Sequence, residues 1–538
     1  MKNIKILDCT LRDGGYYNQW DFDEDMAAQL VQSLNESGVD MIELGYKSID
    51  RSSYYGLFKY CNEELLLDLT ADTQAEYAFM IDAKEFLLPD GRINEAGLKE
   101  VVVPAKDSLF SWVRVASHYG NVAEGPALIR YFQQLGYKVC FNLMGGSLID
   151  DQALVEALQV LAPAGPEVFY IADSFGSFYP DDIRHRIRLI REHFQGEIGV
   201  HLHDNQGMAY ANALAALEEG VDIIDGTVTG MGRGAGNLLL EQFMLGYKER
   251  FHVDSLQPHR LLPVINQYFQ PMKAHHQWGY NYVYMLSGLH NIHQTYCQTL
   301  SGTSRYSMSQ VTEILEEIPP ANRAKFSQEQ VTEAVKRVLA HQEENGDPLP
   351  QLPISPVDRV LITAQGPSLR THLRSIRHFL QQAQVRLVEC NDTGFFADQP
   401  QRQTVILNRP KLERYLTENQ QAHPTLITGE SRVIGHRESQ GDVFHQPYRL
   451  APLAINAEEV CVPDYDAGMY AIAIALRDGA SEIFLAGFDG FEDQAANAVM
   501  EEFFQQANVL CTSHGASLKA ITPTRYQTLD QTSVYALL

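Results

Sequence analysis

Two histidines separated by one residue stand in the stretch HLHDNQG at residues 201–207, directly after a short apolar run at residues 198–200. On a β-strand, residues i and i+2 point to the same face, so His201 and His203 would lie side by side at a strand end. Two imidazoles in this arrangement suit one divalent metal ion. A pair of structural histidines is the alternative, and only the rest of the chain can decide between the two.

Eight short apolar runs recur in the first 255 residues, with amphipathic helical patterns between them. Their spacing is about that of one βα unit. Eight strands that alternate with helices over this length predict a (β/α)8 TIM barrel, with an open doubly wound sheet as the alternative. The runs are residues 4–7, 41–44, 77–81, 112–115, 139–143, 168–171, 198–200 and 223–228.

Polar side chains stand where the expected strands end, which is the edge of a barrel where chemistry takes place. Strand ends that only fill a core would carry Val, Ile or Leu at most of these positions. A carboxylate, an arginine and two histidines instead converge on one mouth, and this favours the metal site. Four further residues, Glu43, Arg114, Asn142 and Asp173, are candidates for binding the substrate. The full set is Arg12, Asp13, Glu43, Arg114, Asn142, Asp173, His201, His203 and Asn237.

The chain has 538 residues, a net charge of −26 and seven cysteines, none of them in a CxxC pair. This length predicts two or three domains. The acidic excess is spread along the chain, which argues against nucleic-acid partners and against an anionic membrane surface. The scattered cysteines fit a reducing compartment. With no signal-peptide pattern and no membrane-spanning run, we expect a cytoplasmic protein without membrane insertion.

Three motifs together resemble the metal-dependent aldolase and lyase superfamily. They are LDCTLRDGG at residues 7–15, HLHDNQG at residues 201–207 and GMGRGAGNLLLE at residues 230–241. Members of this superfamily include 4-hydroxy-2-oxovalerate aldolase, 3-hydroxy-3-methylglutaryl-CoA lyase and isopropylmalate synthase. The motifs occur in the same order and at matching barrel positions, so the resemblance covers roughly the first 255 residues.

The resemblance implies a divalent metal bound by Asp13, His201 and His203. Asn237 matches an asparagine at or near the metal in some members, and Arg12 matches an arginine that stabilises an enolate oxygen. Mn²⁺ or Mg²⁺ would suit the oxygens of a pyruvate-like 2-oxo acid, with Co²⁺ or Zn²⁺ as alternatives. Such an ion is a Lewis acid that stabilises the enolate formed when a C–C bond is made or broken.

Tyr16 departs from the family pattern. In the hydroxy-oxoacid aldolases the third residue after the metal-binding aspartate is a histidine proposed as the catalytic base, and here that position is Tyr16. A phenol at its ordinary pKa is a poor base at neutral pH. Three alternatives stay open: a Tyr16 with a lowered pKa, another group that moves the proton, or an acceptor other than the family's usual one.

Residues 1–255 are expected to form the barrel, and residues 256–345 a helical extension. The resemblance implies that this extension packs by the barrel mouth and carries a catalytic tyrosine, for which Tyr282, Tyr284 and Tyr296 qualify. The run from residue 340 to residue 356 is charged and proline-rich, which is typical of a linker, and residues 346–356 are expected to form that linker. Residues 357–538 show a second pattern of alternating strands and helices, and we expect a Rossmann-like doubly wound α/β domain there.

The second domain opens with RVLITAQGPSL at residues 359–369, which reads as a strand, a glycine turn and a helix start. That geometry can present backbone N–H groups to a phosphate, although a plain βα turn explains it equally well. Together with GASEIFLAGFDGF at residues 479–491, it faintly resembles bacterial Rossmann-like proteins of the sialyltransferase and surface-glycan type. This resemblance implies a nucleotide or sugar ligand near Gly366, Ser368 and Asp489. A docking or dimerising domain without a ligand is the alternative.

Three functions are compatible with these patterns. The first is a metal-dependent aldolase that joins or cleaves a 2-oxo acid and an aldehyde, plausibly sugar-derived and serving surface-polysaccharide synthesis. The second is an acyl-CoA condensing synthase of the same superfamily, which the lack of a basic cluster for the CoA phosphates disfavours. The third is a sugar- or nucleotide-binding assembly protein with a vestigial barrel, which the complete set of metal residues disfavours. By analogy with its relatives, the protein is expected to form a homo-oligomer.

Overall fold

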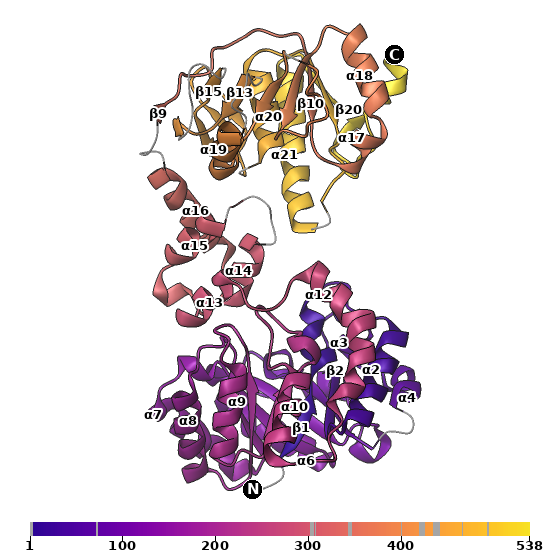
Figure 1. The fold of residues 1–538 in the computed structure, drawn as a ribbon, viewed down its shortest axis with the longest axis vertical. Helices are drawn as coiled ribbons and strands as arrows, with labels where there is room; N and C mark the ends of the chain where they lie inside the picture. The colour runs from indigo at the N-terminus through magenta and orange to yellow at the C-terminus, as the bar shows by residue number, and fades with distance from the viewer. Residues whose placement is uncertain are drawn as a thin grey trace. The chain divides into compact units, whose positions relative to one another are not determined.

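In a computed structural model of the protein, the eight expected strands close into a parallel barrel in the order β1 to β8 (Figure 1). Each strand pairs with its neighbour in sequence, and β8 closes the barrel against β1. The (β/α)8 prediction is confirmed. The strands are β1 (Lys5–Asp8), β2 (Met41–Tyr46), β3 (Glu76–Asp82), β4 (Trp112–His118), β5 (Lys138–Met144), β6 (Val168–Asp173), β7 (Glu197–Leu202) and β8 (Ile223–Gly226).

The structure describes residues 4–70, 74–301, 306, 308–342, 347–399, 401–418, 425–433, 442–464, 466–491 and 494–538. By their contacts the chain divides into two units, one of residues 1–299 with 318–328 and one of residues 300–317 with 329–538. The barrel lies wholly in the first unit, and the second sheet lies in the second.

Helices follow the barrel strands and cover their outer face. One of the two longest, α2, begins where the Asp23 carboxylate accepts a hydrogen bond from the Met26 N–H at 2.8 Å. It ends at Gly38, whose φ of 89° is the left-handed conformation that glycine adopts without strain. The helices are α2 (Glu24–Ser37), α3 (Leu57–Tyr60), α4 (Glu63–Thr70), α5 (Glu95–Val101), α6 (Gly125–Gln134), α7 (Asp151–Leu161), α8 (Pro180–His193), α9 (Ala209–Glu218) and α10 (Leu240–Phe251).

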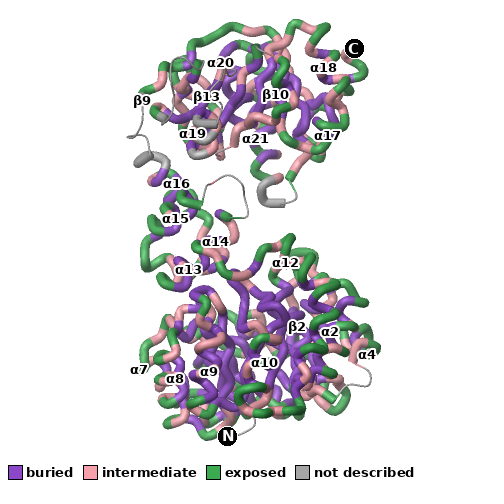
Figure 2. The backbone as a smooth tube through the Cα atoms, in the orientation of Figure 1, coloured by how far each residue is buried: buried purple, intermediate pink, exposed green. Residues whose placement is uncertain are grey.

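The inside of the barrel is filled below its mouth, so chemistry is confined to the mouth. Leu7, Met41, Trp112 and Tyr170 belong to one buried cluster contributed by alternate positions of the strands. Gly199 lies against Tyr170: a Cβ there would come within 2.4 Å of the phenol ring. Figure 2 shows the same division, with buried residues concentrated along the strands of both sheets.

Helices after the barrel are hydrogen-bonded to the loops at its mouth. The Asn205 amide donates to Ser287 Oγ at 2.9 Å, and the Gln294 amide donates to the Ser174 carbonyl at 3.0 Å. The Trp278 indole donates to the Thr229 carbonyl at 3.1 Å. These contacts reach the loops after β6, β7 and β8. The helices are α12 (Gln270–His276), α13 (Tyr282–Leu289), α14 (Gln294–Ser301), α15 (Met308–Glu316) and α16 (Gln328–Gln342).

The second unit contains an eight-stranded sheet in the order β15-β13-β12-β11-β10-β19-β20-β21, and all its pairs are parallel. From β10 the sheet extends through β11, β12, β13 and β15 on one side. Later in the sequence, β19, β20 and β21 extend it on the other side of β10. This doubly wound order confirms the Rossmann-like prediction. The strands are β10 (Arg359–Thr363), β11 (Arg386–Cys390), β12 (Gln403–Val405), β13 (Thr425–Thr428), β15 (Val443–His445), β19 (Glu482–Ala486), β20 (Ser517–Ala520) and β21 (Asp530–Gln531).

Five helices belong to this sheet: α17 (Pro367–Thr371), α18 (Leu373–Gln382), α19 (Arg409–Glu418), α20 (Ala467–Arg477) and α21 (Gln494–Ser513). Part of the expected linker is paired, because β9 (Asp347–Pro348) forms an antiparallel pair with β14 (Arg432–Val433). The expected boundary at residues 345–346 lies outside the described residues. Three short strands, β16 (Tyr448–Leu450), β17 (Ala454–Ile455) and β18 (Val460–Val462), make a separate small sheet. None of the described helices combines the length and the apolar composition needed to cross a membrane.

Candidate metal centre

Asp13, His201 and His203 lie together at the mouth of the barrel. One potential ligand atom from each residue lies within 4.8 Å of those of the other two, and all three side chains are buried. Asp13 ends the short helix α1 (Thr10–Asp13), which directly follows β1. His201 is in β7 and His203 follows its last residue, so the i, i+2 spacing places both imidazoles on one side, with ring centroids 5.2 Å apart.

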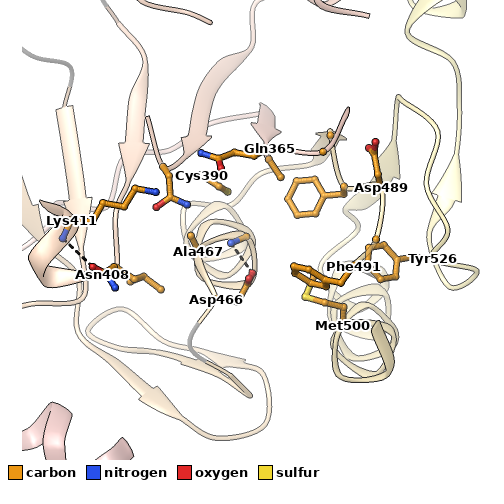
Figure 3. A pocket seen from close by; sticks show the side chains of 18 residues that line it. Gln365, Cys390, Asn408, Lys411, Asp466, Ala467, Asp489, Phe491, Met500 and Tyr526 are labelled. Carbon is orange, nitrogen blue, oxygen red and sulfur yellow. Dashed lines mark hydrogen bonds between the residues drawn. The ribbon is translucent and has the colours of Figure 1, made fainter. Parts of the chain in front are cut away.

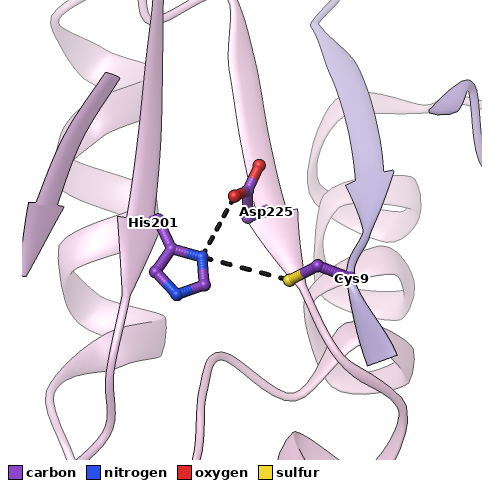
Figure 4. Close-up of side chains that lie close together, drawn as sticks. All are labelled: Cys9, His201 and Asp225. Carbon is purple, nitrogen blue, oxygen red and sulfur yellow. Dashed lines mark hydrogen bonds and ion pairs between the residues drawn. The ribbon is translucent and has the colours of Figure 1, made fainter. Parts of the chain in front are cut away.

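His201 is held by a carboxylate from the neighbouring strand. Its Nδ1 donates a hydrogen bond to Asp225 Oδ2 at 3.0 Å, with the Cys9 sulfur 4.0 Å from the same nitrogen (Figure 4). Burial opposes ionisation of Asp225, but the charge of Arg114 outweighs it and lowers the pKa of this carboxyl. An ionised Asp225 fixes the imidazole with its Nδ1 protonated, which leaves Nε2 available for a metal ion.

His203 offers a neutral imidazole. Burial, in first place, lowers the pKa of His203 to about 3. Its Nδ1 is buried and makes no hydrogen bond to any described residue, and the same is true of Asn237 Oδ1. His203 and Asn237 are joined by an antiparallel backbone bridge, and the Asn237 amide donates to Asp13 Oδ2. A buried nitrogen and a buried oxygen without hydrogen-bond partners, beside a carboxylate and a second imidazole, are suitable ligands for a divalent cation.

The glycines of the GMGRGAGN loop leave room for this arrangement. A Cβ on Gly232 would lie 2.2 Å from the Asn237 amide nitrogen and 2.7 Å from Asp13 Oδ2. A Cβ on Gly14 would lie 2.8 Å from the sulfur of Met231. The loop after β8 therefore approaches Asp13 closely only because it carries glycine at position 232.

Arg12 places a fixed positive charge next to Asp13. Its Nη1 donates to Asp13 Oδ1 at 2.5 Å, and its Nε donates to Glu43 Oε2 at 2.8 Å. Burial opposes the guanidinium charge, but the two carboxylates raise the pKa of Arg12 well above its ordinary value. Arg12 in turn, against the effect of burial, lowers the pKa of Asp13, so that Asp13 is ionised throughout the physiological range.

Glu43 and Arg114 form a buried ion pair with each other. Arg114 is fully buried, its Nη1 donates to Glu43 Oε2 at 2.8 Å, and its Nη2 donates to Asp225 Oδ2. Both residues were substrate-binding candidates, and the structure engages both in ion pairs. They complete a buried charge network that runs in order through Asp13, Arg12, Glu43, Arg114, Asp225 and His201.

The other two substrate candidates differ from each other. Asn142, near the end of β5, is buried, and its Oδ1 makes no hydrogen bond to the described residues. It is thus free to bind a polar group. The Asp173 carboxylate, at the end of β6, accepts hydrogen bonds from the Ser177 N–H at 2.8 Å and the Phe178 N–H at 3.1 Å. Asp173 therefore organises the loop after β6.

The environment of Asp173 predicts a measurable pH effect. Burial, in first place, raises the pKa of Asp173 from 3.8 to about 7. The folded state then holds a proton that the unfolded chain releases near its ordinary pKa, so the stability linked to Asp173 is present at low pH and is lost as the pH rises through 7. Between pH 5 and pH 8, wild type should lose about 2 kcal/mol of unfolding free energy relative to Asp173→Asn. Thermal unfolding of both proteins across this range measures the difference, and a difference independent of pH would contradict the assignment.

Tyr16 lies at the solvent side of the site. It is 40% exposed, and its Oη lies 3.2 Å from that of Tyr46. Arg233 lies over its ring, with the guanidinium carbon 4.9 Å from the ring centroid, and donates to Thr295 Oγ1 at 2.9 Å.

Of the three tyrosines considered in the helical extension, Tyr284 is connected to the mouth. It shares a hydrogen bond with Tyr17, whose Oη also donates to the Gly234 carbonyl at 2.8 Å, and burial raises the pKa of Tyr284 to about 12. Tyr282 is 60% exposed. Tyr296 is buried, and its Oη donates to carbonyls of residues 322 and 325.

Three residues of this site, Asp225, Cys9 and Arg233, were not among the sequence-predicted candidates. The sequence pattern could have indicated Asp225, because an aspartate inside the apolar run at residues 223–228 needs a buried cation or hydrogen-bond donor as a partner. Gly366, Ser368 and Asp489 belong to the second unit. There the Ser368 backbone N–H donates to Asp489 Oδ2 at 2.7 Å, and its hydroxyl donates to Oδ1.

Fold and site together define a class, that of (β/α)8 barrels with an Asp–His–His cluster at the mouth. The model of the HMGL-like family matches residues 3–264. A 4-hydroxy-2-oxovalerate aldolase from Bacillus cereus is 32% identical over 255 residues, which is 46% of this chain and 71% of that protein. One from Chloroflexus aggregans is 32% identical over 243 residues, 45% of this chain and 68% of its own. The chain belongs to the HMGL-like family of aldolases and lyases.

A solved structure agrees with this assignment. The N-terminal domain of an aldolase candidate from Bacteroides vulgatus is 32% identical, with a TM-score of 0.51, and the match covers 56% of this chain and 97% of that domain. The similarity therefore spans nearly the whole of that domain and a little more than half of this chain.

Proposed function

We propose that the barrel makes or breaks a C–C bond next to the carbonyl of a pyruvate-like 2-oxo acid, with an aldehyde as the second substrate. The observation that carries this proposal is the buried cluster of Asp13, His201 and His203 with Arg12 beside it. The relatives named 4-hydroxy-2-oxovalerate aldolase support the same reaction class. We further propose a sugar-derived aldehyde, a role in surface-polysaccharide synthesis, a cytoplasmic location and a homo-oligomer.

Asp13, His201 and His203 would hold one divalent ion, with Asn237 Oδ1 next to it. Mn²⁺ or Mg²⁺ is proposed first, and when bound the ion supplies a Lewis acid that stabilises negative charge on the substrate. The ligand set of one carboxylate and two imidazoles also accepts Co²⁺ or Zn²⁺.

Arg12 acts on the charge that develops during the reaction. Its guanidinium is fixed by Glu43 on one side and Asp13 on the other, so it does not need to reorganise as the enolate oxygen becomes negative. The Asn142 amide is positioned to orient the substrate, since its oxygen is free among the described residues.

Tyr16 Oη is proposed to carry the proton exchanged with the substrate. Arg233 lies against its ring, and Tyr46 Oη lies 3.2 Å from Tyr16 Oη, which places a hydrogen-bonding partner within reach of the proton. Burial keeps the pKa of the Cys9 thiol well above its ordinary value, which excludes this thiol as a base at neutral pH.

The deciding experiment separates enolate chemistry from the choice of aldehyde. Metal content of the purified protein is measured by mass spectrometry, and exchange of the pyruvate methyl protons with deuterium is followed by NMR with each of the four ions added. We expect about one metal per chain and an exchange that stops when the metal is removed by a chelator. Absence of both metal and exchange with every ion would overturn the proposed function and leave the barrel as a binding domain.

A further inference from the structure

Arg233 belongs to the GMGRGAGN loop, which follows β8 at the mouth of the barrel. Gly232, directly before it, approaches the proposed metal ligands so closely that a Cβ there would lie 2.7 Å from Asp13 Oδ2. The guanidinium carbon of Arg233 lies 4.9 Å from the ring centroid of Tyr16, the proposed proton carrier. Arg233 is thus next to the place where the two substrates are proposed to react.

The guanidinium of Arg233 pairs with no carboxylate in the part of the chain that the structure describes. A guanidinium has five N–H donors. One of them donates to Thr295 Oγ1 at 2.9 Å, and the ring of Tyr16 covers one face of the group. The Thr295 hydroxyl carries no charge, so the described contacts hold the side chain in place without balancing its positive charge with a carboxylate.

Other cations near the mouth are balanced. Arg12 binds both Asp13 and Glu43. Lys84, which follows β3, pairs with Asp82 at 3.0 Å. Arg233 differs from both in having no carboxylate beside it among the described residues, and it therefore provides a positive charge that a bound anion could neutralise.

His293 supplies a hydrogen-bond donor in the same cluster. Thr295 joins it to Arg233, because the Thr295 hydroxyl accepts from Arg233 and its backbone N–H donates to His293 Nδ1 at 3.4 Å. Burial, in first place, and then the charge of Arg233 lower the pKa of His293 to about 4, so this imidazole is neutral at pH 7. A neutral imidazole that accepts at Nδ1 carries its proton on Nε2, which makes no hydrogen bond to the described residues.

In the second unit, by contrast, the charged side chains that line a cavity of about 390 Å³ are engaged within the chain (Figure 3). Asp489 accepts two hydrogen bonds from Ser368, and Asp466 caps α20. Lys411 and Asn408 also have partners within the chain. This cavity therefore gives no indication of an anionic ligand, whereas the barrel mouth does.

We infer that the aldehyde substrate carries an anionic group, a phosphate or a carboxylate, which binds the guanidinium of Arg233 and the Nε2–H of His293. This inference rests on the proposed function, because it names the class of aldehyde used at the same site. A guanidinium binds the oxygens of such a group through paired hydrogen bonds. A cation without a carboxylate partner, at the mouth of a chain whose net charge is −26, also attracts an anionic substrate to this site.

The anionic group acts through binding and takes no part in the bond that forms. In the addition, the methyl carbon of pyruvate bonds to the aldehyde carbon, the methyl group loses one proton and the aldehyde oxygen gains one. Binding of the pyruvate carboxylate by Arg233 is the alternative. It would change the rates with all aldehydes by the same factor, so a comparison between aldehydes distinguishes the two.

The test compares each anionic aldehyde with a neutral counterpart. Glyceraldehyde 3-phosphate is compared with glyceraldehyde, and succinate semialdehyde with butanal, by the consumption of pyruvate with the full chain. We expect kcat/KM to favour at least one anionic aldehyde by about tenfold or more. The pair that shows the preference distinguishes a phosphate from a carboxylate.

Arg233→Gln should reduce this preference to less than about twofold, and Arg233→Lys, which keeps the charge, should retain part of it. The ratio of the two aldehydes is the deciding readout, because an effect of the substitution on Tyr16 or on α14 enters both rates equally. Arg188→Gln is the matched control, since Arg188 pairs with Glu219 on the outer helices of the barrel. It should leave the ratio unchanged.

The failure of this inference differs from the failure of the proposed function. If wild type exchanges the pyruvate protons but shows no preference in either pair, or if Arg233→Gln keeps the preference, this inference alone is wrong. If no exchange occurs, titration of the full chain with glycerol 3-phosphate and with butyrate, which cannot react, decides. Binding that Arg233→Gln weakens about tenfold would support the anion site, and unchanged binding or none at about 1 mM would overturn it.

Discussion

Asp13→Asn is expected to remove the bound metal and to slow pyruvate proton exchange roughly a thousandfold, equivalent to about 4 kcal/mol of transition-state stabilisation. The substitution keeps the size of the side chain but removes the one carboxylate of the proposed ligand set, so two imidazoles and an amide remain. Arg12 keeps its second partner, Glu43, and the buried charge network stays closed on that side. The variant should therefore fold like wild type.

Metal content, deuterium exchange and circular dichroism of the same preparation check this result. Asp82→Asn is the matched control, because Asp82 ends β3 and pairs with the exposed Lys84 at 3.0 Å, outside the metal cluster. It should keep both metal and exchange. If Asp13→Asn retained a full complement of metal, the proposed ligand set would be wrong. If it unfolded, the site would be structural.

Arg114→Met is expected to destabilise the barrel by about 3 kcal/mol, because Asp225 would lose its cationic partner and would stay buried with its charge. Methionine fills most of the volume of the arginine stem, so the loss comes from the uncompensated carboxylate. Hydrogen exchange of peptides from β4 and β8 measures the effect in the barrel alone. Arg92→Met, at a position where the side chain is 77% exposed and pairs with Asp90, should leave this exchange unchanged. Equal exchange in both variants would mean that the network does not support the barrel.

The barrel could be predicted because each of its strands is a separate apolar run, and the runs are separated by about the length of one βα unit. The strands that the sequence did not predict are the short ones in the second unit. β21 has two residues, Asp530–Gln531, and β20 has four, Ser517–Ala520. Segments this short show no clear alternation of apolar and polar residues. They become strands only through backbone hydrogen bonds to a neighbouring strand of the sheet.

The metal cluster could be predicted because its residues lie in three motifs at strand ends. The roles of Glu43 and Arg114 could not, because a sequence does not show which side chains neutralise one another. An arginine at the mouth of a barrel can bind an anionic substrate or a neighbouring carboxylate, and the difference depends on Asp225, which is 111 residues away in sequence. Tyr46 was not predicted either, since its partner Tyr16 lies in the turn after α1 and the sequence does not show which strand that turn meets.

The charge network also bears on when the metal can bind during synthesis and folding. The network links side chains at the first strand of the barrel with side chains at its last two strands. Beside it, the hydrogen bond between Asn237 and Asp13 spans 224 residues of sequence. Contacts over such separations form late, after the loops between them have been closed. The complete ligand set therefore exists only once β8 has paired with β1. The ion proposed for this site would therefore bind to a barrel that has already closed.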